Sequence, residues 1–276
     1  MKKDQENSPH LLALARAVGS FFASRESPEH AKVLGSLCEL LTLQNEKGTT
    51  HLLASEYQDL CADPSIFSPV GQADENLPLV LTASGNLYFR RYFEYEIEIA
   101  KYLAARACLE LRSFSSGSLQ FFDQVIRPHL DDSQTLAVGV GMQTNLLFLT
   151  GGPGTGKTRT LALLLACMLK ESPDLSIALA APTGKSAHRM RQSIAQTLED
   201  VDLPSEVAEK LLHSARASTL HRLLESVHGS VDFRRNAGNP LSCDVVVVDE
   251  VSMVDLPLMA KLCSALSQDT VLILAG

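Results

Sequence analysis

The sequence predicts an α/β protein in which a smaller, mainly helical domain precedes a doubly wound parallel sheet. From about Phe114 onward, apolar runs of strand length alternate with stretches of helical apolar spacing, the pattern of repeated βα units. One run contains four consecutive valines, Val245–Val248, which is typical of a parallel strand buried on both faces. Earlier stretches show helical spacing with polar breaks and no such alternation. We therefore expect a helical domain over residues 1–113 and an α/β domain over residues 114–276.

The first domain is expected to consist mostly of helices. Helical apolar spacing covers Leu11–Phe22, Ala31–Leu43, Thr50–Cys61 and Tyr92–Leu111. Residues 63–76 contain proline and glycine and predict a loop. The apolar stretches 79–82 and 86–89 flank Ala-Ser-Gly, which predicts a small β-hairpin.

The second domain is expected to alternate strands with helices. The pattern predicts strands at 146–150, 176–181, 243–248 and 270–275, and helices at 157–170, 184–198 and 256–267. In an open parallel sheet the loops after the strands gather at one edge, where ligands bind. Functional residues are therefore expected directly after the strands.

Composition limits the classes of protein that fit. The chain has 276 residues and a net charge of −8, which excludes a broad basic surface and leaves a local groove for any nucleic acid. Six cysteines without C-x-x-C spacing predict free thiols in a reducing compartment. Apolar runs are too short to cross a membrane and the N-terminal residues lack an apolar signal core. We expect a cytoplasmic protein without a membrane partner.

A glycine-rich loop follows the first expected strand. Its sequence, Gly-Gly-Pro-Gly-Thr-Gly-Lys-Thr, fits the P-loop pattern G-x-x-x-x-G-K-[ST] and precedes a helical stretch. Such a loop turns its backbone N–H groups toward a phosphate, and the helix adds its positive end. Lys157 is expected to reach the β- and γ-phosphates, and the Thr158 hydroxyl to bind Mg²⁺. The residues expected to hold the nucleotide are Gly151, Gly152, Pro153, Gly154, Thr155, Gly156, Lys157 and Thr158.

Two acids follow the valine run. Asp249 is suited to a water-linked contact with Mg²⁺, and Glu250 to a general base that polarises an attacking water. A small-molecule kinase needs no base for water, so this pair favours a hydrolase. The catalytic candidates are therefore Lys157, Asp249 and Glu250, with Thr158 and Asp249 as metal ligands. The alternative interpretation is a solvated acidic strand end.

Two further stretches begin expected helices with hydroxyl residues. Ala-Pro-Thr-Gly-Lys-Ser-Ala ends at Ala187, and Ser-Thr-Leu-His-Arg-Leu-Leu ends at Leu224. Backbone amides and a hydroxyl at a helix start suit a phosphate of a second ligand. The alternative is that these hydroxyls only cap helices.

The four motifs together, GGPGTGKT, APTGKSA, STLHRLL and VVVVDEVSM, resemble the first RecA-like motor domain of superfamily 1 DNA helicases. More closely, they resemble the RecD family, whose members are subunits of RecBCD-type exonuclease V complexes. The resemblance is dense from Gln134 to Gly276 and thin before residue 77. It implies an ATP- and Mg²⁺-dependent 5′–3′ DNA helicase acting in double-strand break repair and recombination.

The resemblance also implies roles for individual residues. Gln134 corresponds to the glutamine that recognises adenine. Contacts with the DNA strand are implied for Pro182, Thr183, Lys185, Thr219 and His221, and residues 226–242, with Arg234 and Arg235, match an insertion that forms a strand-separating pin. The implied partners are single- and double-stranded DNA and RecB- and RecC-like subunits in a hetero-oligomer, with the N-terminal domain used for docking.

RecD-like motors need a second RecA-like domain with an arginine finger, which lies outside these 276 residues. The resemblance therefore predicts that the chain is the front portion of a helicase and is inactive alone. Two alternatives stay open: a nucleotide- or partner-binding module without turnover, and an unrelated P-loop hydrolase. DNA-stimulated ATP hydrolysis separates the helicase from both.

Overall fold

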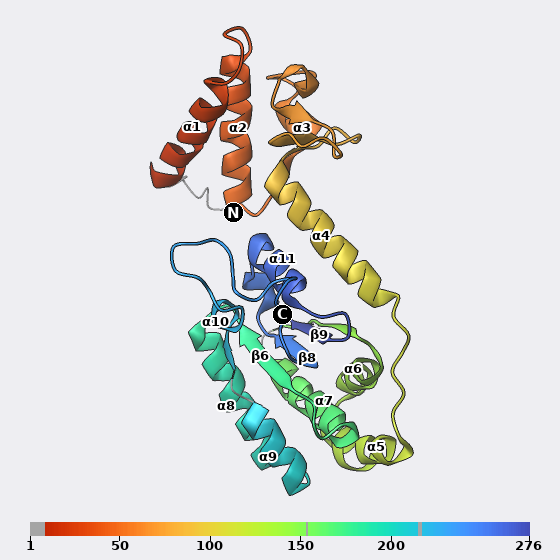
Figure 1. Ribbon diagram of the computed structural model, residues 1–276. Helices are drawn as coiled ribbons and strands as arrows, with labels where there is room; N and C mark the ends of the chain where they lie inside the picture. The colour runs from red at the N-terminus through yellow and green to blue at the C-terminus, as the bar shows by residue number, and fades with distance from the viewer. Residues whose placement is uncertain (1–8, 153, 215–216) are drawn as a thin grey trace. The chain divides into compact units, whose positions relative to one another are not determined.

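The computed structural model describes residues 9–152, 154–214 and 217–276 (Figure 1). The chain forms two compact units, Met1–Ile97 and Glu98–Gly276. The division falls inside helix α4 (Arg90–Ala107), earlier than the boundary expected after residue 113. Because α4 is one continuous helix, its apolar spacing has no break that could mark the boundary between the two units.

The first unit combines a helical pair with a small sheet. Helix α1 (Pro9–Ala23) packs along α2 (Ala31–Glu46). The two helices approach closely where both carry glycine: a Cβ on Gly19 would lie 2.7 Å from the carbonyl oxygen of Gly35. Both helices were predicted from their spacing, and both are confirmed.

The four-stranded sheet has the order β1-β4-β3-β2. Its strands are β1 (His51–Leu52), β2 (Val70–Gly71), β3 (Leu79–Leu81) and β4 (Leu87–Phe89), with the 3₁₀ helix η1 (Pro64–Ile66) and the short helix α3 (Ala54–Tyr57) between them. The predicted hairpin is confirmed as the antiparallel pair β3–β4. The single helix predicted over 50–61 is wrong, because His51 and Leu52 pair with β4, a contact that local spacing does not encode.

The second unit contains a five-stranded parallel sheet of order β5-β9-β8-β6-β7. Its strands are β5 (Leu146–Leu149), β6 (Ile177–Ala181), β7 (Ser218–Thr219), β8 (Val245–Val248) and β9 (Val271–Ala275). The doubly wound sheet is thereby confirmed. The valine run is buried on both faces: Val245 and Val247 join one core cluster, whereas Val246 and Val248 join the other.

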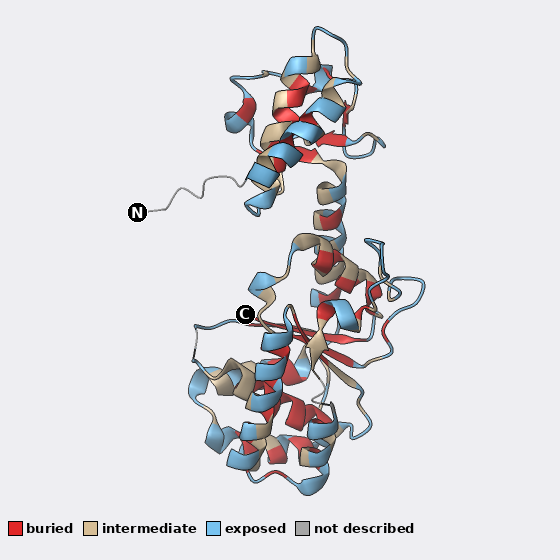
Figure 2. Ribbon diagram, turned by 90° about the vertical axis from the view of Figure 1, so that its left-hand side faces the viewer, coloured by how far each residue is buried: buried red, intermediate tan, exposed pale blue. Residues whose placement is uncertain are grey.

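Helices cover both faces of this sheet. They are α5 (Ser116–Phe121), the π-helical turn η2 (Phe122–Ile126), the 3₁₀ turn η3 (Arg127–His129), α6 (Asp132–Gln143), α7 (Lys157–Glu171), α8 (Gly184–Asp200), α9 (Ser205–Ser214), α10 (Leu220–Leu223), the 3₁₀ turn η4 (Val251–Met253) and α11 (Leu256–Ala265). Figure 2 shows the buried residues of this unit gathered on the strands and on the helix faces against them. Helix α7 supplies nine buried residues, Leu161 to Leu169, to one core, and α11 supplies Leu258 and Leu262 to the other.

Helix α6 was not among the predicted helices. Two glycines lower its intrinsic helix propensity, so its pattern is weak. One of them has a packing reason, because a Cβ on Gly141 would lie 2.6 Å from Leu164 of α7. The helix begins at a capping box formed by Asp131 and Gln134.

The C-terminal turns of α4 belong to the second unit. Arg106 is 4% exposed, and its guanidinium donates to the carbonyl oxygens of Thr270 and Ser267. The guanidinium carbon lies 4.5 Å from the ring centroid of Tyr102. The six cysteines are free thiols. Over the described part of the chain, no helix combines the length and the apolar character needed to span a bilayer.

Candidate functional site

The glycine-rich loop connects β5 with α7, as expected. Gly154 (φ 78°) and Gly156 (φ 76°) both adopt the left-handed conformation, which side chains with a Cβ rarely accept. Gly156 is the N-cap of α7, so the first amides of the helix follow directly on the loop. The predicted contact at Pro153 lies outside the described residues. The left-handed glycines and the helix N-terminus directly after them are suited to a phosphate.

The side chain of Lys157 folds back over this loop. Its Nζ donates to the carbonyl oxygens of Gly151 at 2.5 Å and Gly152 at 3.0 Å. The cation is therefore held at the mouth of the loop before any phosphate enters. A polyphosphate would replace neutral carbonyl partners by charged ones, which form stronger hydrogen bonds.

A hollow of about 300 Å³ adjoins the loop. Its lining comprises Ser133, Gln134, Ala137, Phe148, Leu149, Thr150, Gly151, Thr155, Lys157 and Thr160. The Nε2 of Gln134 donates to the carbonyl oxygen of Thr155 at 3.1 Å, and its Oε1 accepts from the backbone of Asp131. Gln134 therefore lies beside the loop, and its amide also caps α6. Phe148, which the sequence marked only as a strand residue, is 53% exposed in the same hollow.

Asp249 follows β8 directly and reaches the start of α7. Burial raises the pKa of the Asp249 carboxyl above its ordinary value, and the Glu250 charge raises it further. The backbone N–H of Glu250, the charge of Lys157 and the hydroxyl of Thr158 act in the opposite direction. The structure thus brings the two predicted metal ligands, Thr158 and Asp249, together. A hydroxyl beside a half-buried carboxylate fits Mg²⁺, which takes few protein ligands and completes its shell with water and phosphate.

Glu250 has an unusual backbone. Its φ of 53° and ψ of 41° place it in the left-handed region, where a non-glycine residue is uncommon. This conformation turns the chain sharply between β8 and η4. The Glu250 carboxylate accepts a hydrogen bond from the hydroxyl of Ser186, a contact that sequence reasoning missed. No local signal could have found it, because 64 positions separate the two residues.

The two hydroxyl motifs lie at one edge of the sheet. Thr183 caps α8 by accepting from Ser186 N at 3.1 Å, and Thr219 caps α10 by accepting from Arg222 N at 3.2 Å. Strands β6 and β7 pair in parallel, with Ala181 beside Thr219. The predicted DNA residues Pro182, Thr183, Lys185 and Thr219 therefore come together at the carboxyl edge, and Lys185 is exposed there.

The segment 226–242 is braced by local contacts. Arg235 donates through Nε and Nη2 to one carboxylate oxygen of Glu225, at 2.8 and 2.7 Å. The His221 ring lies 5.8 Å from that of Phe233, which pairs with Ser226. Arg235 is therefore engaged within the protein, whereas the other predicted pin residue, Arg234, is exposed.

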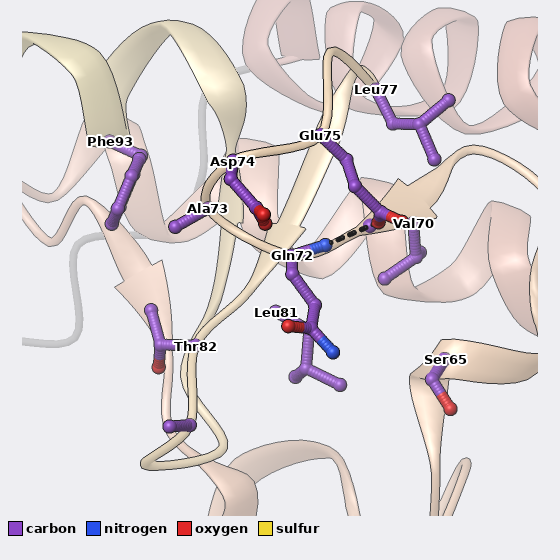
Figure 3. A pocket seen from close by; sticks show the side chains of 12 residues that line it. Ser65, Val70, Gln72, Ala73, Asp74, Glu75, Leu77, Leu81, Thr82 and Phe93 are labelled. Carbon is purple, nitrogen blue, oxygen red and sulfur yellow. Dashed lines mark hydrogen bonds between the residues drawn. The ribbon is translucent and has the colours of Figure 1, made fainter.

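A larger hollow, of about 750 Å³, lies in the first unit (Figure 3). It is lined by Asp74 and Glu75 but by no cationic side chain among the described residues. Its loop is braced by the guanidinium of Arg90, which donates to the carbonyl oxygen of Gln72 at 3.0 Å. An anionic nucleotide would be repelled by this acidic lining, which favours the smaller hollow beside the P-loop as the candidate nucleotide site.

A parallel RecA-like sheet with a P-loop after its edge strand β5 and an Asp-Glu pair after β8 defines a P-loop nucleotide-binding protein. Residues 134–276 match the AAA domain family, and the chain belongs to this family. Proteins of this family use ATP.

The chain is also similar to named RecD proteins. It is 40% identical to the RecBCD enzyme subunit RecD of Haemophilus influenzae over 203 residues, covering 70% of this chain and 31% of that protein. It is 42% identical to the RecD subunit of Mycolicibacterium smegmatis over 151 residues, covering 52% and 27%. The ATP-dependent RecD2 DNA helicase of Deinococcus radiodurans is 37% identical over 131 residues, covering 48% and 15%. The matched part thus spans less than a third of these relatives.

Proposed function

We propose that the protein is a motor component of an ATP-dependent 5′–3′ DNA helicase of the RecD type, acting in double-strand break repair and recombination. One observation carries the proposal: the P-loop, the Asp249–Glu250 pair and both hydroxyl motifs lie along one edge of the same sheet. In this proposal a nucleotide and a DNA backbone occupy the same edge of the sheet. The named relatives, RecBCD subunits and a RecD2 helicase, support the same activity.

In this proposal the P-loop residues bind ATP. The first amides of α7 and the Lys157 ammonium hold the phosphates, and Thr158 and Asp249 hold Mg²⁺, which supplies charge neutralisation on the phosphates when bound. Glu250 orients and polarises the water that attacks the γ-phosphate, giving ADP and phosphate. Gln134 recognises the adenine. The left-handed backbone of Glu250 fits this role, because strained conformations concentrate at functional residues.

The DNA strand is proposed to follow the carboxyl edge through Pro182, Thr183, Lys185, Thr219 and His221. Helix starts hold backbone phosphates through N–H groups, so this path needs no broad basic patch, in agreement with the net charge of −8. Arg234 is the exposed cation of the proposed pin. Arg235 stabilises that segment through Glu225.

The N-terminal unit is proposed to dock RecB- and RecC-like subunits. Its described residues form a core of their own around Leu34, Leu37 and Leu79. The proposed compartment is the cytoplasm.

The test is ATP hydrolysis by the full-length helicase, which includes the second RecA-like domain, with and without single-stranded DNA, together with co-purification of RecB- and RecC-like proteins. Stimulation of hydrolysis by DNA is expected, with weak dependence on sequence and a shallow salt dependence. ATP binding without any DNA effect would contradict the helicase proposal and favour a binding module or another P-loop hydrolase.

A further inference from the structure

The two acids after β8 contact different elements, although they are adjacent in sequence. Asp249 interacts with Lys157 and Thr158 at the start of α7. The carboxylate of Glu250 accepts instead from the hydroxyl of Ser186, in the first turn of α8. The acid proposed to activate water is therefore held by the helix that begins on the proposed DNA path.

The direction of the hydrogen bonds follows from what each group can donate. A carboxylate only accepts, so Ser186 gives its single hydroxyl hydrogen to Glu250. The hydroxyl oxygens of Thr183 and Ser186 lie 2.8 Å apart, and Ser186 has no hydrogen left to donate. Thr183 must therefore be the donor in this pair. The result is a series of two hydrogen bonds, in which Thr183 donates to Ser186 and Ser186 donates to Glu250.

This series of hydrogen bonds runs from a solvent-exposed side chain to a half-buried one. Thr183 is exposed, Ser186 is 6% exposed, and Glu250 is half-buried. Successive hydrogen bonds strengthen one another, so the bond to Glu250 depends on the bond that Ser186 receives. A change in the hydrogen bonding of Thr183 therefore alters the hydrogen bond that the Glu250 carboxylate accepts.

We propose that Ser186 is a positioning residue that restrains Glu250 and makes ATP hydrolysis depend on a nucleic-acid backbone at Thr183. A phosphate oxygen is a charged acceptor and competes with Ser186 for the Thr183 hydrogen. When the phosphate takes that hydrogen, the Ser186–Glu250 bond weakens and the carboxylate turns toward the nucleotide. The inference rests on the proposed function, because it needs both ATP hydrolysis and a DNA backbone at α8.

The test is Ser186→Ala in the full-length helicase, which includes the second RecA-like domain. The substitution removes the hydroxyl but keeps the Ser186 backbone N–H that Thr183 accepts, and alanine is a better helix former. Without DNA, kcat is expected to rise about threefold to tenfold, as for a weakened hydrogen bond to a charged group. The stimulation by oligo(dT) is expected to fall by a similar factor, and KM for ATP to stay unchanged.

Two further variants complete the test. Ser186→Thr keeps a hydroxyl and is expected to restore the dependence on DNA. Ser193→Ala removes a half-buried serine from the same helix and should behave as wild type. A Ser186→Ala protein with wild-type stimulation, or with basal and stimulated rates lowered alike, would overturn the positioning role and leave the helicase proposal standing. A wild type that does not bind ATP or respond to DNA would overturn both.

Discussion

The Nζ atom of Lys157 lies 2.5 Å from the carbonyl oxygen of Gly151, inside the loop that precedes its own helix. The ammonium group is thus held at the loop, with the carbonyl oxygens of Gly151 and Gly152 as its partners. A phosphate at this position would gain both the amides and the cation.

Lys157→Ala is therefore expected to weaken ATP and ADP binding. Loss of a hydrogen bond to a charged partner is worth about 1.5–3 kcal/mol, which corresponds to a Kd roughly 10- to 150-fold higher. Isothermal titration calorimetry measures the change. Lys170→Ala, in the last turn of the same helix, serves as the control and should bind as wild type. Equal affinity of Lys157→Ala and wild type would refute the P-loop assignment.

In the full-length helicase, Glu250→Gln is expected to separate nucleotide binding from hydrolysis. The amide keeps the size of the side chain but is a poor base, so kcat should fall by about 10²–10⁴ while nucleotide affinity stays near wild type. Steady-state ATPase assays and calorimetry give the two values. Glu209→Gln, at an exposed position of α9, is the control. A parallel loss of nucleotide affinity would mean that Glu250 holds the nucleotide and does not activate water.

The double substitution Thr183→Ala, His221→Ala tests the DNA path. In the full-length helicase, DNA affinity and DNA-stimulated hydrolysis are expected to fall, while stability changes by less than about 2 kcal/mol because a lost N-cap costs about 1. Fluorescence anisotropy with labelled single strands and denaturant unfolding measure the two effects. Ser115→Ala removes the N-cap of α5 and should affect stability alone. Unchanged DNA affinity in the double variant would remove the DNA-path assignment.

Asp244 is expected to stabilise the fold in a pH-dependent manner. The hydroxyl and backbone N–H of Ser176 both donate to it and hold the pKa of its carboxyl below the ordinary 3.8. A lowered folded-state pKa means that the stabilisation is complete above pH 3.8 and is lost as pH falls through the folded value. Asp244→Asn should cost about 0.5–1 kcal/mol at neutral pH, allowing for solvent screening at this exposed site.

Urea unfolding near neutral pH and at about pH 3 compares Asp244→Asn with wild type. The difference between the two proteins should shrink in acid. Asp269→Asn, at an exposed turn position before β9, is the control and should show no difference at either pH. A difference for Asp244→Asn that grows in acid would contradict the assigned sign.

Arg106→Ala is expected to destabilise the second unit by about 3 kcal/mol, because it removes the guanidinium donor from the buried Thr270 carbonyl oxygen and one of two donors from the Ser267 carbonyl oxygen. Arg106 is buried and donates to Thr270 and Ser267. Arg127→Ala breaks an exposed pair with Asp123 and should cost less than about 0.5 kcal/mol. Thermal unfolding followed by circular dichroism gives both values. Equal effects of the two substitutions would show that the Arg106 contacts add nothing to stability.

Much of the second unit could be predicted because its signals are local. The P-loop, the valine run and the hydroxyl caps at Thr183 and Thr219 each occupy a few consecutive residues, and each was found where the sequence placed it. Where packing competes with local preference, prediction was less complete. Strand β1 was taken for part of a helix, and α6 with its two glycines was not predicted.

The sequence by itself determined the strand-loop-helix order, the phosphate-binding loop and the acids after β8, because these patterns depend on the spacing of neighbouring residues. Only the tertiary structure decided which distant groups meet. It joined Ser186 to Glu250, Arg235 to Glu225 and Arg106 to the turn before β9. These pairings depend on how the sheet and its helices pack, and packing combines contributions from the whole chain that local spacing does not contain.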